Sequence, residues 1–472
     1  MAGIGFELKK LYKQGGGITR TVGAMGYSTM TAVGSTLLIV GALIVTSLLM
    51  SYWGVGEYEK NLFAGCVLYC FVFSLILTSV FDTVLSRYVS DCIFSDQEQK
   101  LLPAVQGATA IFAVIFGLVG GVFGAMLYFI GDLDAYYVLM VYLLLMGVGL
   151  TFGISVFVTA IKAYRRITFS YLFGSLLILL TGAACRFVLR MPIGHSMITG
   201  FAAGFLSIAV QLYFFLHLAF PRGDKSYFSF FRSVRANKLL LLSGLFYSLG
   251  LYAHNAVFWL DSDLQVIVAR IIHCAPAYDM ASFVAMLTSI TSMVVFVVRV
   301  ETSFYREYKG YCESVIGNNL KNIELSREKM SRTLVNEVYF IGEFQIIITI
   351  VLMCVGITFL PALGISGVTL DIYPILALGY YAVFIMHLLM IFLYYFDDQR
   401  GAAFVGFIFF ALTLICTLIS QRMGIAYYGL GLVVSGVIGW SVAFIRLRRV
   451  MRRVDDIMFC DNVKRGAADA VS

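Results

Sequence analysis

The sequence has little charge and little proline for its length. Asp, Glu, Lys and Arg make up 13% of the 472 residues and 60% are hydrophobic, whereas an average soluble domain is roughly a quarter charged and half apolar. So few polar side chains cannot cover a globule in water. A mean hydropathy of +0.89 and repeated apolar runs of about twenty residues, each able to cross roughly 30 Å of hydrocarbon, therefore indicate a multi-pass helical membrane protein.

The sequence also lacks the motifs of common enzyme and metal sites. It contains no GxxxxGK[ST], HExxH or GxSxG segment. None of the nine cysteines forms a CxxC pair, and most lie in apolar runs, so neither a disulfide framework nor a zinc site is indicated. Two Asp-x-Asp pairs, at 132–134 and 261–263, resemble a glycosyltransferase motif, but the topology below places both outside the cell. We expect no enzyme activity, no metal and no cofactor.

Twelve apolar spans separated by charged or glycine-rich breaks account for most of the chain. They run at about 27–51, 62–84, 104–130, 137–161, 168–189, 195–219, 239–260, 279–299, 338–360, 373–396, 401–420 and 424–445. With both termini in the cytoplasm, the cytoplasmic loops and tails hold 28 Lys and Arg and the opposite side holds five. This asymmetry is what the positive-inside rule requires, so the net charge of +7 reflects membrane orientation and not nucleic-acid binding. We predict a protein of the cytoplasmic membrane with both termini cytoplasmic.

These spans predict an all-α fold of twelve transmembrane helices in two six-helix lobes. The expected parts are a cytoplasmic amphipathic segment at 1–26, an N-terminal lobe at 27–220, a cytoplasmic linker at 221–238, a C-terminal lobe at 239–446 with a long cytoplasmic loop at 301–336, and a basic cytoplasmic tail at 447–472. In the first segment Ile4, Leu8 and Leu11 share a helical face among lysines, as in a helix lying on the membrane. The six prolines lie at span ends or in loops, so no span is expected to have a proline kink near its middle.

Polar residues in apolar helices are candidates for a transport path, because a charge near the bilayer centre costs roughly 2.5–3.5 kcal/mol. The candidates are Asp82, Arg186, His254, Asp261, Glu343 and His387. Other interpretations stay open: Asp82 close to the headgroups with Arg87 or Lys100 in reach, Arg186 snorkelling to the interface, and both histidines as satisfied core residues.

Several stretches resemble the integral membrane subunit of the Pel exopolysaccharide export machinery, the PelG family. They are MAGIGFELKK at the start, RYVSD (87–91) followed by LLP (101–103), AYDMASFVAMLTSITSMVVFVVRVETSFYREY (277–308), YYFDDQRGAA (394–403) and YYGLG (427–431). The chain departs from the family where prolines are expected: it has AVGSTLL at 32–38 and Ile290-Thr291-Ser292 in the eighth span. The missing prolines leave the predicted topology unchanged. They argue against a gating motion that depends on proline kinks.

The resemblance implies a polysaccharide exporter of the flippase superfamily that includes multidrug exporters. The implied substrate is a polymer rich in N-acetylgalactosamine and galactosamine, and the implied partners are a cytoplasmic glycosyltransferase, a membrane-bound cyclic di-GMP receptor and a further membrane protein. In the matched segment Arg299, Glu301, Tyr305, Tyr308 and Tyr311 are candidates for docking the synthase; a helix anchored at the headgroups by its tyrosines is the alternative. Alternative functions are a lipid-linked oligosaccharide flippase, a small-molecule antiporter and a synthase scaffold that does not transport.

Overall fold

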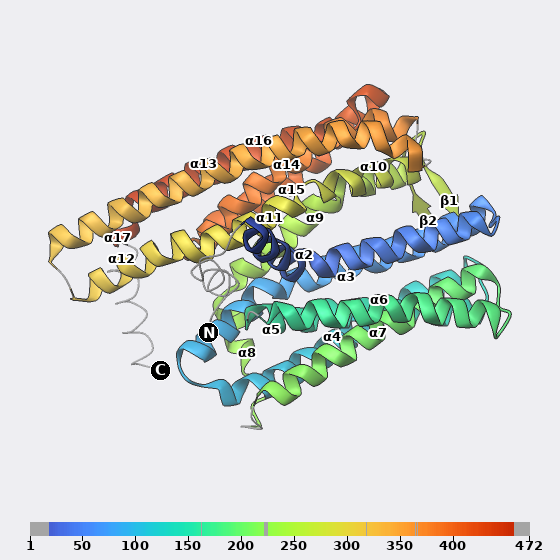
Figure 1. The fold of residues 1–472 in the computed structure, drawn as a ribbon, viewed down its shortest axis with the longest axis horizontal. Helices are drawn as coiled ribbons and strands as arrows, with labels where there is room; N and C mark the ends of the chain where they lie inside the picture. The colour runs from blue at the N-terminus through green and yellow to red at the C-terminus, as the bar shows by residue number, and fades with distance from the viewer. Residues whose placement is uncertain are drawn as a thin grey trace. The chain divides into compact units, whose positions relative to one another are not determined.

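The protein, seen in a computed structural model, consists of long helices and, in its described part, one small hairpin of strands (Figure 1). The structure describes residues 18–161, 163–220, 225–317, 319–363, 365 and 367–456; side chains are described from residue 34 on, except at 291, 294, 297, 298, 301, 302, 363 and 456. Residues 1–17 of the expected amphipathic segment, 221–224 of the linker and 457–472 of the tail therefore lie outside the described residues.

The contacts within the chain divide it into two compact units. Unit 1 comprises Met1–Ser248 and Phe258–Asp279, and unit 2 comprises Leu249–Val257 and Met280–Ser472. The chain therefore passes from one unit to the other three times, within α9 (Lys238–Leu260) and within α10 (Pro276–Leu287).

Unit 1 contains the first six long helices. These are α2 (Ile18–Tyr52), α3 (Glu57–Phe94), α4 (Leu101–Phe129, preceded by the short η1, Glu98–Lys100), α5 (Ala135–Ala160), α6 (Tyr164–Phe187) and α7 (Ile193–Ala219). Helix α5 is central, because it packs against α3, α4 and α7. A Cβ at Gly149 or Gly153 would lie 2.5 Å from the ring of Phe116 or Phe112 respectively, so these glycines let α4 and α5 approach closely.

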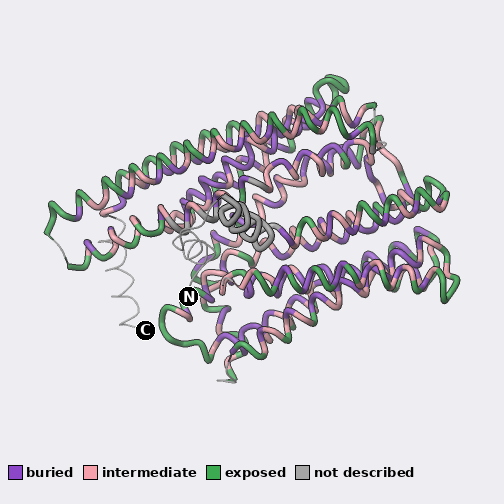
Figure 2. Tube along the Cα trace, viewed as in Figure 1, coloured by how far each residue is buried: buried purple, intermediate pink, exposed green. Residues whose placement is uncertain are grey.

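Unit 2 contains the later helices. These are α11 (Ile290–Arg299), the π-helix η2 (Val300–Phe304), α12 (Tyr305–Gly317), α13 (Leu320–Phe359), η3 (Leu360–Leu363), α14 (Val368–Tyr395), α15 (Gln399–Arg422), η4 (Ile425–Tyr427), α16 (Leu430–Arg452) and α17 (Val454–Asp456), with most of α10. Helix α14 is the most buried span of this unit, whereas few residues of α13 are buried (Figure 2). Pro374 lies inside α14, six residues after its start, and not at its end as the sequence suggested.

Eleven helices in the described part of the chain are long and apolar enough to cross a membrane. The apolar run at 279–299 is not among them, because the chain turns at Thr288 and Ser289 and forms two short helices, α10 and α11. The run expected as the eighth span is thus present as a discontinuous helix.

A short hairpin of strands follows α9 and belongs to unit 1. Strands β1 (Val266–Val268) and β2 (Ile272–Cys274) pair antiparallel, with Ile267 opposite His273. Two of the three turn residues, Ala269 and Arg270, have positive φ angles of 48° and 61°, which residues with a side chain seldom adopt. We infer that packing against the helices of unit 1 holds this turn, since each such residue costs of order 1–3 kcal/mol.

The hairpin is attached to α3 at two places. The hydroxyl of Tyr69 donates to the carbonyl of His273 at 2.8 Å, and the ring of Tyr69 stacks on Trp259 at 5.3 Å. A Cβ at Gly65 would lie 3.9 Å from the Cβ of Ile272. At the foot of the hairpin, Asp279 accepts from Trp259 Nε1 at 2.9 Å and from the backbone N–H of Ala275 at 3.0 Å.

We predict that Gly65→Cys combined with Ile272→Cys forms an intramolecular disulfide, because a Cβ separation of 3.9 Å lies within the 3.5–4.5 Å that disulfides require. In a background without the nine native cysteines, two maleimide-PEG additions should appear only after reduction. Pairing Ile272→Cys with Gly56→Cys, whose Cβ would meet nothing within 4 Å, is the control and should leave both thiols free. Two free thiols in the Gly65 pair would contradict the described packing of the hairpin.

Candidate transport site

The discontinuous helix of unit 2 satisfies its own freed backbone groups. Where α10 ends, the side chain of Thr288 donates to the carbonyl of Ala285 at 2.7 Å and that of Ser289 donates to the carbonyl of Met286 at 3.1 Å. Their backbone N–H groups donate to the same two carbonyls at 3.1 Å. Such satisfaction is obligatory in a membrane, where no water replaces a lost helical hydrogen bond.

Gln345 of the neighbouring helix α13 supplies a further hydrogen bond to the backbone at the break. Its Nε2 donates to the carbonyl of Thr288 at 3.4 Å and to Thr349 Oγ1 at 2.9 Å. Gln345, Thr349 and Ser292 are all fully buried. Gln345 Oε1 and Ser292 Oγ have no hydrogen-bond partner among the described residues. Buried polar atoms without partners are costly and are often found where water binds or where a protein functions.

A second polar cluster lies on the other side of the break, between α9, α10 and α14. The hydroxyl of Tyr380 is 2.8 Å from Ser282 Oγ and 3.5 Å from His254 Nε2. Ser282 donates to Asn255 Oδ1 at 3.5 Å. All four side chains are buried, and Ser282 belongs to α10, the helix that ends directly before the break at Thr288. His387 is half-buried in α14, two turns from Tyr380 and therefore on the same helix face.

An ion pair fixes the far end of α11 to α13. Arg299 donates to both carboxylate oxygens of Glu337, through Nε to Oε2 and through Nη2 to Oε1 at 3.2 Å. Its guanidinium also lies 3.9 Å from the ring centroid of Phe340, an attractive cation–π arrangement. The Glu337 side chain is only 5% exposed, so its charge depends on Arg299.

Glu337, Ile341, Gln345 and Thr349 are four residues apart on α13 and all are buried. They form a stripe that faces α11 and runs from the ion pair to the break. Directly after Arg299 the chain forms the π-helix η2. Single π-helical turns are rare and occur frequently at functional sites. The broken helix, the stripe and the π-helix together form the candidate site.

Glu343, a predicted path residue, lies on the other face of α13. It is exposed, as are Tyr339 and Ile347 one turn before and after it. The sequence analysis did not predict the stripe residues, because three of the four carry no charge. The available signal was the spacing of two polar side chains, Gln345 and Thr349, one turn apart in the otherwise apolar segment 344–351.

Three predicted path residues, Asp82, Arg186 and Asp261, lie in unit 1, whereas His254 and His387 lie in unit 2. Asp82 is exposed in α3, and Asp261 is exposed just after α9. Arg186 is half-buried near the end of α6 and donates through Nη1 to the carbonyl of Met191 at 3.0 Å, so it stabilises the following loop. Among the described residues no hydrogen bond or ion pair joins any two of these three.

The predicted docking residues of α12 differ in their exposure. Tyr305 is 49% exposed, whereas Tyr308 packs against Phe304 and Phe396 at ring distances of 5.9 and 6.1 Å. Tyr311 is fully buried and donates to Asp455 Oδ1 at 2.7 Å. Burial, and then the neighbouring Asp455, raise the pKa of Tyr311, so its phenol stays protonated and remains a donor. The side chain of Glu301 lies outside the described residues.

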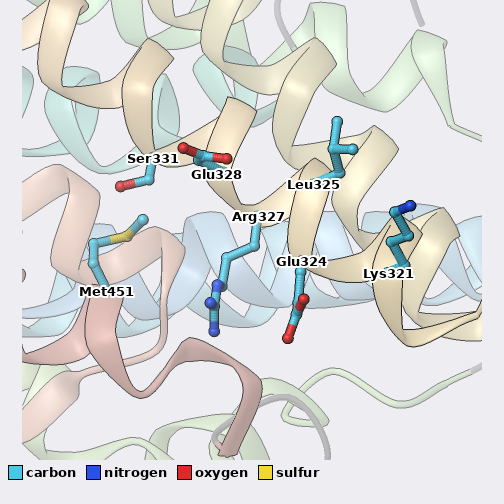
Figure 3. A pocket seen from close by; sticks show the side chains of 7 residues that line it. All are labelled: Lys321, Glu324, Leu325, Arg327, Glu328, Ser331 and Met451. Carbon is cyan, nitrogen blue, oxygen red and sulfur yellow. The ribbon is translucent and has the colours of Figure 1, made fainter.

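Asp455 also pairs with Arg327 of α13, and it therefore attaches α17 to both α12 and α13. Beside these contacts of Asp455, an open groove lies between α13 and the end of α16. Its lining residues are Lys321, Glu324, Leu325, Arg327, Glu328, Ser331 and Met451 (Figure 3). Figure 3 shows Arg327 and Glu324 projecting toward the same side of α13. Charges of both signs in an open groove suit a protein surface better than an apolar small molecule.

Solved structures of membrane transporters are similar to this chain over almost its whole length. An outward-facing multidrug resistance MATE family transporter of the MOP superfamily has a TM-score of 0.62 and 12% identity, covering 96% of this chain and 97% of its own. A MOP superfamily transporter from Pyrococcus furiosus Vc1 has a TM-score of 0.62 and 12% identity, with 91% and 96% covered. The Vibrio cholerae MATE transporter VcmN in the bent form has a TM-score of 0.57 and 15% identity, with 95% and 99% covered.

The fold is therefore similar to that of MATE and other MOP superfamily transporters, and the predicted all-α membrane class is confirmed. A family model described as "PelG: Putative exopolysaccharide Exporter (EPS-E)" matches residues 1–459. The chain belongs to the PelG family, a family of transporters and not of enzymes, as the resemblance indicated. No curated protein matches the sequence.

We predict that Glu337→Gln lowers the stability of the protein by about 2 kcal/mol, less than the 3–5 kcal/mol for a fully buried pair because the Arg299 side chain is 38% exposed. The midpoint of thermal unfolding in detergent should fall by roughly 2 °C, because the entropy of unfolding scales with the 472 residues of the chain. Glu343→Gln, the same change on the exposed face of α13, is the matched control and should have little effect.

Replacing both partners, in Arg299→Met/Glu337→Met, should restore much of the loss, because no uncompensated charge remains. Equal effects of the Glu337 and Glu343 variants would contradict the described pairing.

Proposed function

We propose that this protein moves an exopolysaccharide across the cytoplasmic membrane and that the discontinuous helix α10–α11 takes part in the movement. The observation that carries the proposal is the break at Thr288 and Ser289 inside an apolar run of a chain whose family is described as an exopolysaccharide exporter. Discontinuous helices form substrate and ion sites in many transporters because they bring unwound backbone and polar side chains to membrane depth.

A change in the angle between α10 and α11 would expose the polar groups that now lie buried. Gln345 Oε1 and Ser292 Oγ have hydrogen-bonding capacity that the described residues do not use. Hydroxyl and amide groups of this kind suit the uncharged hydroxyls and acetamides of a sugar polymer. We expect them to contact the polymer, or water that accompanies it, during one stage of transport.

The finer parts of the proposal follow the resemblance to the family. The substrate is a polymer rich in N-acetylgalactosamine and galactosamine, and the eleven long helices together with α10–α11 make twelve spans in two six-helix lobes with both termini cytoplasmic. The domain limits stay at 1–26, 27–220, 221–238, 239–446 and 447–472. The positive charge of amino sugars would be balanced by carboxylates along the path. Asp82, Asp261 and Glu343 are the proposed carboxylates, and all three are exposed. Arg186, His254 and His387 complete the proposed path.

A small-molecule antiporter is the second candidate, because one similar structure is a multidrug resistance transporter. An antiporter would work without a synthase. The exporter depends on polymer made by a cytoplasmic glycosyltransferase, and the further proposed partners are a membrane-bound cyclic di-GMP receptor and another membrane protein.

We predict that Gln345→Ala lowers export about fivefold, because it removes hydrogen bonds worth about 1 kcal/mol at the break. Proteoliposomes containing the protein and its synthase partners would be supplied with sugar nucleotide outside. Polymer inside the vesicles is then measured separately from the total polymer made, so that a lower ratio reports transport and not synthesis.

Thr358→Ala is the control on the same helix, because Thr358 is exposed and donates only to the Cys354 carbonyl of its own helix at 2.9 Å. A parallel fall in inside and total polymer would favour a scaffold. Export that continues without synthase partners would favour the antiporter. If both Asp82→Ala and Glu343→Ala leave the ratio of inside polymer to total polymer unchanged, the proposal of an acidic path is wrong.

The orientation and the docking surface can be tested together at Tyr305. Arg299, Glu301, Tyr305, Tyr308 and Tyr311 are the proposed docking segment, and Tyr305 has the most exposed side chain among those described. We predict that Tyr305→Cys, in a background without native cysteines, reacts with an impermeant maleimide only after cells are permeabilised, and that a crosslinker attached there captures the glycosyltransferase.

The control is Tyr427→Cys, at a residue that is 45% exposed and is expected on the outer side. It should react in intact cells and capture no glycosyltransferase. Labelling of Tyr305→Cys in intact cells would reverse the proposed orientation, and no capture from an active complex would favour a helix anchored at the headgroups.

A further inference from the structure

The described part of the linker, from Lys225 to Asn237, is fixed firmly to unit 1. It contains the short helix α8 (Phe230–Ala236). The hydroxyls of Ser229 and Tyr88 of α3 lie 2.5 Å apart. Phe230 is only 2% exposed and packs edge-on against Tyr88 at a ring distance of 6.5 Å. The described part of the linker is therefore packed against unit 1.

Two independent contacts fix how deep the linker lies along the helices. The carbonyl oxygen of Tyr227 is so near Gly107 that a Cβ there would lie 2.0 Å from it, and Gly107 lies six residues after the first residue of α4. Tyr88 lies six residues before the last residue of α3. At 1.5 Å per residue, both contacts place the linker about 9 Å inside the helix ends. This depth corresponds to the interfacial zone of a membrane, where aromatic belts occur.

The outer side of the linker combines aromatic rings with positive charge. Tyr227, Phe228 and Phe231 are 44%, 55% and 39% exposed. Lys225, Arg232, Arg235 and Lys238 are also exposed. Residues 225–238 contain no Asp or Glu, and among the described residues no ion pair is formed by these four cations. In the described part of the linker, the surface thus presents three rings and four cations that form no ion pair.

We propose that this surface binds the headgroups of anionic phospholipids in the leaflet that the linker faces. The rings suit the boundary between headgroups and acyl chains, and arginine binds phosphate oxygens with paired N–H groups. A protein partner approaching through water would have to reach a segment about 9 Å below the ends of α3 and α4. We infer that lipid headgroups occupy that depth, because α3 and α4 are both long and apolar enough to span a membrane. The inference is independent of which substrate the protein exports.

The test uses full-length, delipidated protein in detergent, titrated with dioleoyl phosphatidylglycerol or dioleoyl phosphatidylcholine and followed by native mass spectrometry. Wild type should bind the first phosphatidylglycerol more tightly than phosphatidylcholine. Each basic residue near an anionic surface contributes roughly fivefold to association, so Arg232→Gln/Arg235→Gln should reduce this preference by about tenfold or more. The preference should also weaken as the salt concentration rises.

Arg165→Gln/Arg166→Gln is the matched control, because both residues are exposed arginines at the start of α6 in the same unit. An equal loss in both double variants would show that general charge, and not the linker, selects the lipid. A photoreactive residue in place of Phe228 provides a second test in native membranes. A lipid adduct supports the proposal, whereas a protein adduct in place of a lipid adduct overturns it.

Discussion

The structure depends on one constraint: every backbone polar group at membrane depth needs a partner inside the protein. A continuous helix meets this requirement automatically, and the described part of the chain departs from it within an apolar run at Thr288 and Ser289. There the two hydroxyl side chains and Gln345 supply the bonds that the helix no longer makes. Gln345 of α13 thus stabilises the break between α10 and α11 from outside the broken helix.

The same constraint separates two kinds of polar residue in unit 2. Glu337 and Gln345 are buried, and their partners on α11 and α10 fix the relation of these helices to α13. Glu343, which lies between them in sequence, is exposed and free of such a role. The two faces of α13 thus differ: one carries buried polar side chains that are bonded to the broken helix, and the other carries the exposed Glu343.

The sequence was sufficient to predict the membrane class, the positions of eleven long helices and the family, because hydropathy and the specific stretches MAGIGFEL and VRVETSFYREY are local signals. It was insufficient to locate the polar stripe. Whether Glu337 or Glu343 faces a neighbour depends on the rotation of α13 about its axis, and the residues of Glu337–Thr349 are apolar on most sides. Likewise, helical spacing places Tyr311 on the same face as Tyr308. The sequence does not show that Tyr311 donates to Asp455, which lies 144 residues later in the chain.

The break between α10 and α11 differs in kind from a proline kink. Residues 277–299 contain neither proline nor glycine, so every backbone N–H needed for an unbroken helix is present and no covalent feature keeps the two pieces apart. Rejoined, residues 276–299 would form a rod of about 36 Å, long enough to cross the bilayer. A proline removes a backbone N–H permanently, whereas at this interruption every N–H is present and the freed groups are held by a few side-chain hydrogen bonds.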